Sequence, residues 1–238
     1  MESFFVKGIT RRNRLTLLLL VIWFGSLWGA AEALIGGLLH SLLPPTVPGK
    51  IMIVAATGIM AWALRKTGKW WAPVGIAMVA APLKLFSAVV FVLPITAPVV
   101  LNPALGIFAE GIGFSLIYLL FCGLPVARWA KFVAIGAGAG AIYSFVFVGT
   151  VVGIGLSVYP PMEVIKELGT KFPYWARSTS GLINFAKTSL PYSAIMAGIG
   201  SALVVVLPAK TYPRLNPKGL LSGSALWLTI FFVSSWLT

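Results

Sequence analysis

Three ionisable residues, Glu32, Lys84 and Glu110, each interrupt a long apolar run of the chain. A charge near the centre of a bilayer costs about 3 kcal/mol on insertion scales, so such residues are retained by pairing, by water or by function. Two carboxylates against one ammonium leave a surplus negative charge, which a cationic solute, a proton or a metal ion would neutralise. The alternative is a structural ion network in which Lys84 locks three helices together.

Two ring-bearing residues accompany Glu32 along the same predicted helix. Trp28 comes one turn before Glu32 and would form an aromatic wall beside the carboxylate. His40 comes two turns after Glu32, on nearly the same helix face, and would form the rim of a binding site. A single histidine at a helix end is weak evidence for a metal, so the presence of a metal ion stays open.

The elements that must position these residues are membrane-spanning helices. The chain is 59% apolar and 10% charged over 238 residues, whereas soluble domains are about 25% charged. We therefore predict an all-α integral membrane protein with a single transmembrane domain, residues 1–238, and apolar runs of roughly the length that crosses a bilayer. Seven spans are expected: 15–39, 51–64, 72–93, 103–123, 131–157, 189–208 and 219–237. The second is short for a full crossing.

The basic residues predict the orientation of these spans. Twelve of them precede the first span or follow the second, fourth and sixth, whereas five lie in the opposite loops. The positive-inside bias therefore predicts a cytoplasmic N-terminus in a multi-pass protein of the cell membrane. The net charge of +13 is distributed as topology information and forms no single basic face, which argues against nucleic acid as a partner.

Spacing along the spans predicts that the three charges share one depth. Glu32 lies eight residues before His40, Lys84 nine before Leu93, and Glu110 seven after Pro103. At 1.5 Å per residue, each charge would lie about 10 to 14 Å below the outer surface. A single polar cluster that opens outward is expected.

The sequence lacks the residues that several kinds of catalytic and metal site require. The chain has no Asp, one His and one Cys, so a Ser-His-Asp triad and a cysteine-rich zinc site are excluded. It also has no phosphate-binding loop of the G-x-x-x-x-G-K-[ST] type. We predict no enzymatic activity and no cofactor. Cys122 is expected to be a small buried residue of the fourth span.

Small residues recur at every fourth position of the first span, at Gly25, Gly29, Ala33 and Gly37. Such a stripe lets another helix approach closely. Either it packs the protein's own bundle or it docks a partner membrane protein. Both readings stay open.

Three motifs together carry a resemblance to a known family. They are Trp28-Gly29-x-x-Glu32-x-x-x-Gly36-x-x-Leu39-His40, Leu83-Lys84-x-x-Ser87 and Asn102-Pro103-x-x-x-Ile107-x-x-Glu110. The chain, over about its first six spans, resembles the substrate-binding (S) components of energy-coupling factor transporters. The seventh span departs from the six-helix members.

The resemblance implies a function, partners and site residues. Members of that family capture a vitamin or a metal ion from outside and dock through the first helix on a transmembrane T component with two ATPases, in a prokaryotic cell membrane. It implies docking through Gly25, Gly29 and Ala33. The predicted solute-binding residues are Glu32, Lys84, Glu110, Trp28, His40 and Asn102.

The outer loop, predicted over 158–187, contains a short helical segment and aromatic residues. It would be either a lid over the cluster or an ordinary interfacial helix.

Two function classes other than solute capture are an accessory subunit and an ion or proton pathway. The chain could be a non-catalytic anchor or accessory subunit of a larger membrane complex, with structural buried charges; the seventh span favours this reading. An ion or proton pathway is the other class, but the residues below the cluster are largely apolar and offer no continuous route.

Overall fold

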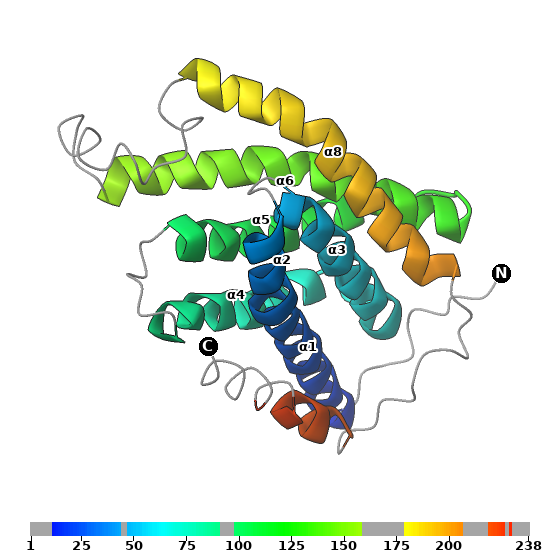
Figure 1. Ribbon diagram of the computed structural model, residues 1–238. Helices are drawn as coiled ribbons and strands as arrows, with labels where there is room; N and C mark the ends of the chain where they lie inside the picture. The colour runs from blue at the N-terminus through cyan, green and yellow to red at the C-terminus, as the bar shows by residue number, and fades with distance from the viewer. Residues whose placement is uncertain are drawn as a thin grey trace.

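The computed structural model describes residues 11–43, 47–90, 98–158, 179–206, 219–226 and 229, except for some side chains within these helices. Every regular element in these ranges is helical, and none of the described residues forms a strand. Figure 1 shows long helices packed side by side. The predicted all-α class is therefore confirmed.

The first span is one helical rod with a local change of geometry. Helix α1 covers Arg11–Ala31, a single π-helical segment η1 covers Glu32–Gly36, and α2 covers Gly37–Leu42. A π-helix widens the turn by one residue and occurs often at functional sites. Glu32 is the first residue of this segment.

The other helices follow the predicted runs with shifted ends. They are α3 (Val47–Thr67), α4 (Ala72–Val90), α5 (Pro98–Phe121), α6 (Arg128–Val158) and α8 (Thr179–Val206). The second span is not short, because α3 begins before the apolar run and has 21 residues. Helices α3 and α5 begin earlier than predicted, at Val47 and Pro98. Pro48 and Pro98 lie in their first turns, where a proline is well tolerated.

The structure describes part of the predicted outer loop and part of the predicted seventh span. The predicted outer loop, 158–187, is wrong over 179–187, since α8 already begins at Thr179. The polar residues of this first part of α8, among them Asn184 and Lys187, are exposed, so an apolar-run criterion misses a helix there. Residues 159–178 lie outside the described residues, and so does the part of the loop that was predicted to be a lid.

The predicted seventh span, 219–237, is described only in part. Residues 219–226 of this span are helical, and most of its other residues lie outside the described ranges.

Five helical stretches are long and apolar enough to cross a membrane: Arg14–Gly36, Val47–Thr67, Pro103–Phe121, Arg128–Phe147 and Ile183–Val205. Large apolar side chains such as Leu18, Leu120 and Phe145 are exposed on their surfaces. A lipid-facing surface accounts for this exposure, because water-soluble monomers rarely expose such extensive apolar patches. Length and composition place the chain among multi-pass helical membrane proteins.

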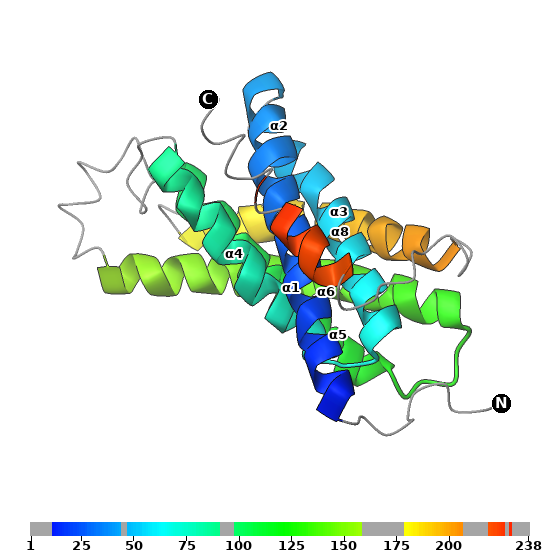
Figure 2. The same ribbon diagram turned by 90° about the horizontal axis from the view of Figure 1, so that it is seen from below.

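The contacts made at glycine positions show the relative directions of neighbouring helices. A Cβ added at Gly25 would meet Val79, and one added at Gly29 would meet Leu83, so α1 and α4 are parallel. Gly113 faces Ala139, and Gly138 faces Ile117, so α5 and α6 are antiparallel. Helices α6 and α8 also pack closely, and α8 lies against α3 (Figure 2).

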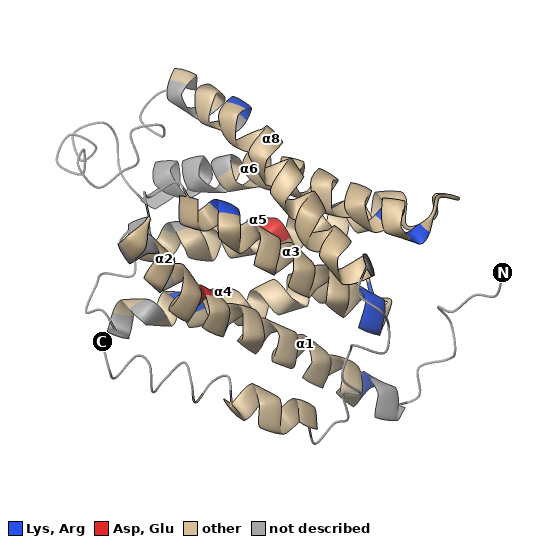
Figure 3. Ribbon diagram, turned by 45° about the vertical axis from the view of Figure 1, so that its right-hand side comes forward, with Lys and Arg blue, Asp and Glu red and all other residues tan. Residues whose placement is uncertain are grey.

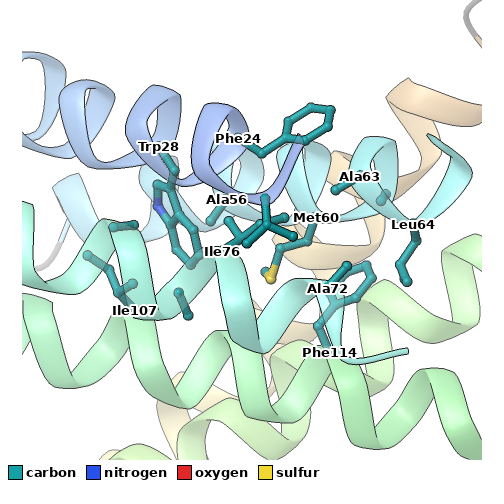
Figure 4. Close-up of a cluster of buried hydrophobic side chains, with 14 of the residues drawn as sticks. Phe24, Trp28, Ala56, Met60, Ala63, Leu64, Ala72, Ile76, Ile107 and Phe114 are labelled. Carbon is teal, nitrogen blue, oxygen red and sulfur yellow. The ribbon is translucent and has the colours of Figure 1, made fainter. Parts of the chain in front are cut away.

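The main core lies where α1, α3, α4 and α5 meet. Phe24 and Trp62 form an edge-to-face pair with ring centroids 5.1 Å apart, and Trp23 packs against both rings. Figure 4 shows Phe24, Met60, Ile76 and Phe114 gathered between these helices. Aromatic pairs of this geometry add about 0.5 to 1.5 kcal/mol beyond the burial of their area.

Basic side chains gather at one end of the bundle, here named the basic end. It contains Arg14 of α1, Arg65 and Lys66 of α3, Lys69 before α4, and Arg128 and Lys131 of α6. The guanidinium of Arg65 donates a hydrogen bond to the carbonyl of Val204, which places the end of α8 there as well. In Figure 3, by contrast, the acidic segments lie within the helices.

Cys122 departs from its predicted burial. Helix α5 ends at Phe121, and the Cys122 side chain is exposed just beyond this end. The prediction was wrong because the apolar run extends past the last helical residue.

Candidate functional site

Glu32 lies at the π-helical segment of the first span, where its carboxylate turns along the helix. A Cβ added at Gly36 would lie 3.0 Å from Oε2 of Glu32 and 4.0 Å from Cγ of Met52. The missing side chain at Gly36 therefore leaves the space that the carboxylate occupies. Glu32 is partly buried, and Gly36 is buried.

Lys84 faces Glu32 from the neighbouring helix α4. Its side chain is only 6% exposed, and the ammonium and the Glu32 carboxylate attract one another. The close approach of Gly29 to Leu83 and Ala80 brings η1 and this part of α4 to the same height. Two of the three predicted charges are thus brought together. Pro82, one residue before Leu83, is an internal helix proline, and a proline removes one backbone hydrogen bond from its helix.

Glu110 lies apart from Lys84. A Cβ added at Gly111 would lie 2.5 Å from Cβ of Ala77 and 2.9 Å from the carbonyl of Pro73, and Ala77 comes two turns before Lys84. At 1.5 Å per residue this separation is about 10 Å along α4. Glu110 is therefore offset from Lys84 along α4, toward the start of that helix, and the shared depth of the three charges in a bilayer stays a prediction.

Glu110 nevertheless belongs to the same electrostatic environment. Its carboxylate repels that of Glu32, and it lines a narrow crevice with Ile53, Thr57, Ala139, Gly140 and Tyr143. In this arrangement the crevice is closed and has no room for a water molecule. No cationic group among the described residues offsets the charge of Glu110. Lys84 thus balances Glu32, and Glu110 is the surplus carboxylate.

Tyr143 and Thr57 are site residues that the sequence did not reveal. Tyr143 interacts electrostatically with Glu110 and Glu32, and its ring stacks on Phe147 with a centroid distance of 5.6 Å. Thr57 donates its hydroxyl hydrogen to the carbonyl of Ile53, 2.7 Å away, which is the usual arrangement within a helix. Neutral polar residues are common in apolar spans, so their type and position gave no distinguishing pattern.

Trp28 is part of the core as well as a neighbour of Glu32. Its side chain is fully buried and lies near Ile107 (Figure 4). The indole N–H interacts with the Glu32 carboxylate but makes no hydrogen bond of normal geometry within the described residues. Trp28 would contact a solute only inside a closed site, unlike the open wall that we predicted.

The remaining predicted site residues are located only by their backbones. His40 lies in α2 and Asn102 in α5, and their side chains lie outside the described part of the structure. Among the described residues, no three His, Cys, Asp or Glu side chains come together as a metal site.

The stripe of small residues is used within the bundle. A Cβ at Gly25 would lie 2.5 Å from Cβ of Val79, and one at Gly29 would lie 2.6 Å from Cδ1 of Leu83. Both positions are buried against α4, as the intramolecular interpretation of the stripe predicts, and docking of a partner stays a prediction. Ala33 is partly buried, and Gly37 is the first residue of α2.

Comparisons with known proteins give no relative for this chain. No protein-family model matches the sequence, and neither a curated protein nor a solved structure is significantly similar to it.

Proposed function

We propose that this chain is a solute-capture subunit of a membrane uptake transporter, of the energy-coupling factor type that the sequence resembles. The observation that carries the proposal is the buried Glu110, which lines a crevice with Tyr143 and interacts with the Glu32 carboxylate but with no cation among the described residues. An unbalanced charge inside a membrane bundle is costly, so its retention favours a functional role.

The charge balance favours a cationic or zwitterionic small solute. With all three groups ionised, the cluster has one more negative charge than positive charges. A solute ammonium would restore balance at Glu110, with the Tyr143 ring and hydroxyl beside it in the crevice. Aromatic faces stabilise such cations by about 0.5 to 2 kcal/mol.

The direction of uptake follows from the topology that we infer. The positive-inside bias places the basic end in the cytoplasm, and with it the N-terminus. Glu32 comes eighteen residues after Arg14 and ten before the end of α2. The Glu32–Lys84 pair therefore lies nearer the outer end, and the solute would enter from outside. The crevice beside Glu110 is narrow, so entry requires the helices to separate.

Transport would require further subunits, because the sequence has no phosphate-binding loop. By the resemblance, these are a transmembrane T component and a pair of ATPases. Since Gly25 and Gly29 pack against α4, such a partner would meet a different face of α1 or require α1 and α4 to part.

The test uses the full chain purified in detergent. Small molecules released from the protein by denaturation are identified by mass spectrometry, and the same is done for Glu110→Gln. We expect a cationic compound at about one per chain in the wild type and at least a tenfold loss in the variant, which is about 1.4 kcal/mol of binding free energy. Equal amounts of every compound in both proteins would refute the proposal.

The second candidate is a non-catalytic anchor or accessory subunit of a larger membrane complex. Two observations favour it: Lys84 is buried against Glu32, as in a structural ion pair, and the additional helical segment 219–226 packs on α1 near Trp23. Copurification separates the two functions. An ATPase pair favours transport, whereas other large membrane subunits favour the anchor.

A further inference from the structure

A second cavity lies at the basic end, far along α1 from the three residues Glu32, Lys84 and Glu110, here named the ionic cluster. It has a volume of about 420 Å³ and is lined by Arg14, Leu17, Leu18, Lys69 and Trp71. Its walls come from the start of α1 and from the turn that leads into α4. Cationic and apolar side chains therefore line one hollow.

The two cations of this cavity make no ion pair with any described residue. The acidic residues of the described ranges are Glu32 and Glu110, and both interact within the ionic cluster. Other cations of the basic end are used differently: Arg65 donates to the carbonyl of Val204, and Lys131 donates to the carbonyl of Cys122 at 2.8 Å. As far as the described ranges go, Arg14 and Lys69 are thus available for an anion.

The turn before α4 holds Lys69 in a defined place. Gly68 ends α3 with a φ of 62°, in the left-handed region that glycine adopts without strain. The amide of Lys69 donates to Oγ1 of Thr67 at 3.3 Å, and the amide of Ala72 donates to the carbonyl of Lys69 at 3.1 Å. A backbone fixed in this way reduces the entropy lost when the lysine binds a ligand.

The apolar wall of the cavity faces the surroundings of the bundle. Leu18 is 53% exposed and Trp71 is 38% exposed, while Leu17 is partly buried. Tryptophan is enriched where a bilayer meets water, at the level of lipid head groups. The cations and the apolar wall therefore match the two parts of one phospholipid.

We propose that this cavity binds an anionic phospholipid. Arg14 and Lys69 hold the head-group phosphate, and Leu17 and Leu18 lie along the start of an acyl chain. Basic pockets between membrane helices are known to select such head groups. The inference rests on the membrane class of the protein and does not depend on the proposed solute-capture function.

The test measures lipid binding to the full chain in detergent by native mass spectrometry. Phosphatidylglycerol and phosphatidylcholine with the same acyl chains are compared in the wild type, in Arg14→Gln, in Lys69→Gln and in the double variant. We expect phosphatidylglycerol to bind preferentially. Each substitution should weaken its binding about fivefold and the double variant about 25-fold, since one basic residue near an anionic lipid surface contributes about 1 kcal/mol.

The matched control is Arg128→Gln, which removes one exposed cation from the same end outside the cavity. We expect it to change phosphatidylglycerol binding less than about twofold. Equal binding of the two lipids, an unchanged double variant, or an equal loss in the control would overturn the proposal. Glycerol 1-phosphate serves as a soluble competitor. If it displaces the lipid at equal concentration, a simple anion site replaces the lipid site.

A further measurement needs no variant and so is independent of folding defects. A photoreactive phosphatidylglycerol is crosslinked to the wild type, and the labelled peptides are mapped. Labels on residues 14–18 and 69–71 support the site. Labels confined to other segments contradict it.

Discussion

Glu32 and Lys84 attract one another across the contact of η1 with α4, whereas Glu110 has no described cation to balance it. The two carboxylates therefore differ in their energetic roles. Glu32 attracts the buried Lys84 ammonium, and its loss removes that attraction. Glu110 is the group whose charge is available to a ligand.

Glu32→Gln should destabilise the protein, since it leaves the buried Lys84 ammonium without its carboxylate. Removing one partner of a buried ion pair costs about 3 kcal/mol or more. Thermal unfolding in detergent, followed by circular dichroism, measures the change. In a Glu32→Gln/Lys84→Met double variant most of the stability should return, because both charges are absent. A double variant less stable than Glu32→Gln alone would contradict this account of the pair.

Glu110→Gln should affect solute retention and not stability, the reverse of Glu32→Gln. It removes a buried carboxylate that repels Glu32, so the midpoint of thermal unfolding should stay the same or rise. The solute retained by the wild type should be lost. If the variant unfolds as readily as Glu32→Gln while retaining the same small molecules, Glu110 has a structural role.

Tyr143→Phe tests the other side of the crevice. The substitution removes the hydroxyl, which lies 3.4 Å from a Cβ added at Gly106, one turn before Glu110, and preserves the ring that stacks on Phe147. We expect retention of the solute to fall severalfold, equivalent to about 1 kcal/mol for one lost hydrogen-bonding group. The unfolding midpoint should change little. Unaltered retention would exclude the hydroxyl from the site.

Gly25→Ala tests whether the stripe packs the bundle. The new methyl would lie 2.5 Å from Cβ of Val79 and 2.9 Å from the carbonyl of Ile76, so α1 and α4 must separate. Overpacking of this kind costs about 1 to 3 kcal/mol. Gly49→Ala is the control, because no atom lies within 4 Å of the added methyl and alanine favours a helix by about 1 kcal/mol.

The two outcomes of that experiment are clearly distinct. We expect Gly25→Ala to lower the unfolding midpoint and Gly49→Ala to leave it unchanged or raise it. A stable Gly25→Ala variant that loses a copurifying partner would favour the docking interpretation of the stripe.

Gly140→Ala should loosen the contact between α6 and α8. A Cβ at this position would overlap the carbonyl group of Ser193 and crowd Ala197. The same substitution at Gly149, in the same helix, meets nothing within 4 Å. Unfolding midpoints of the two variants should differ in favour of Gly149→Ala, by an amount equivalent to about 1 to 3 kcal/mol. Indistinguishable midpoints would mean that the helices shift without cost.

Hydropathy was sufficient to predict the helices, because about 20 apolar residues in one run have few stable alternatives to a helix within a bilayer. It was less informative about their ends. Pro98 and Thr179 begin their helices before the apolar runs start, and Cys122 follows a helix that stops within its run. Hydropathy measures the residues that lipid accepts, whereas hydrogen bonding decides where a helix ends.

The sequence by itself determined the class of protein, the existence of its spans and the presence of buried charges, since these depend on residue type along the chain. Only the tertiary structure decided which charges meet. Lys84 attracts Glu32, Glu110 lines a crevice with Tyr143, and the stripe at Gly25 faces α4. These relationships depend on the rotation and crossing of whole helices. Rotation and crossing are set by packing between residues far apart in the chain, and no local pattern records them.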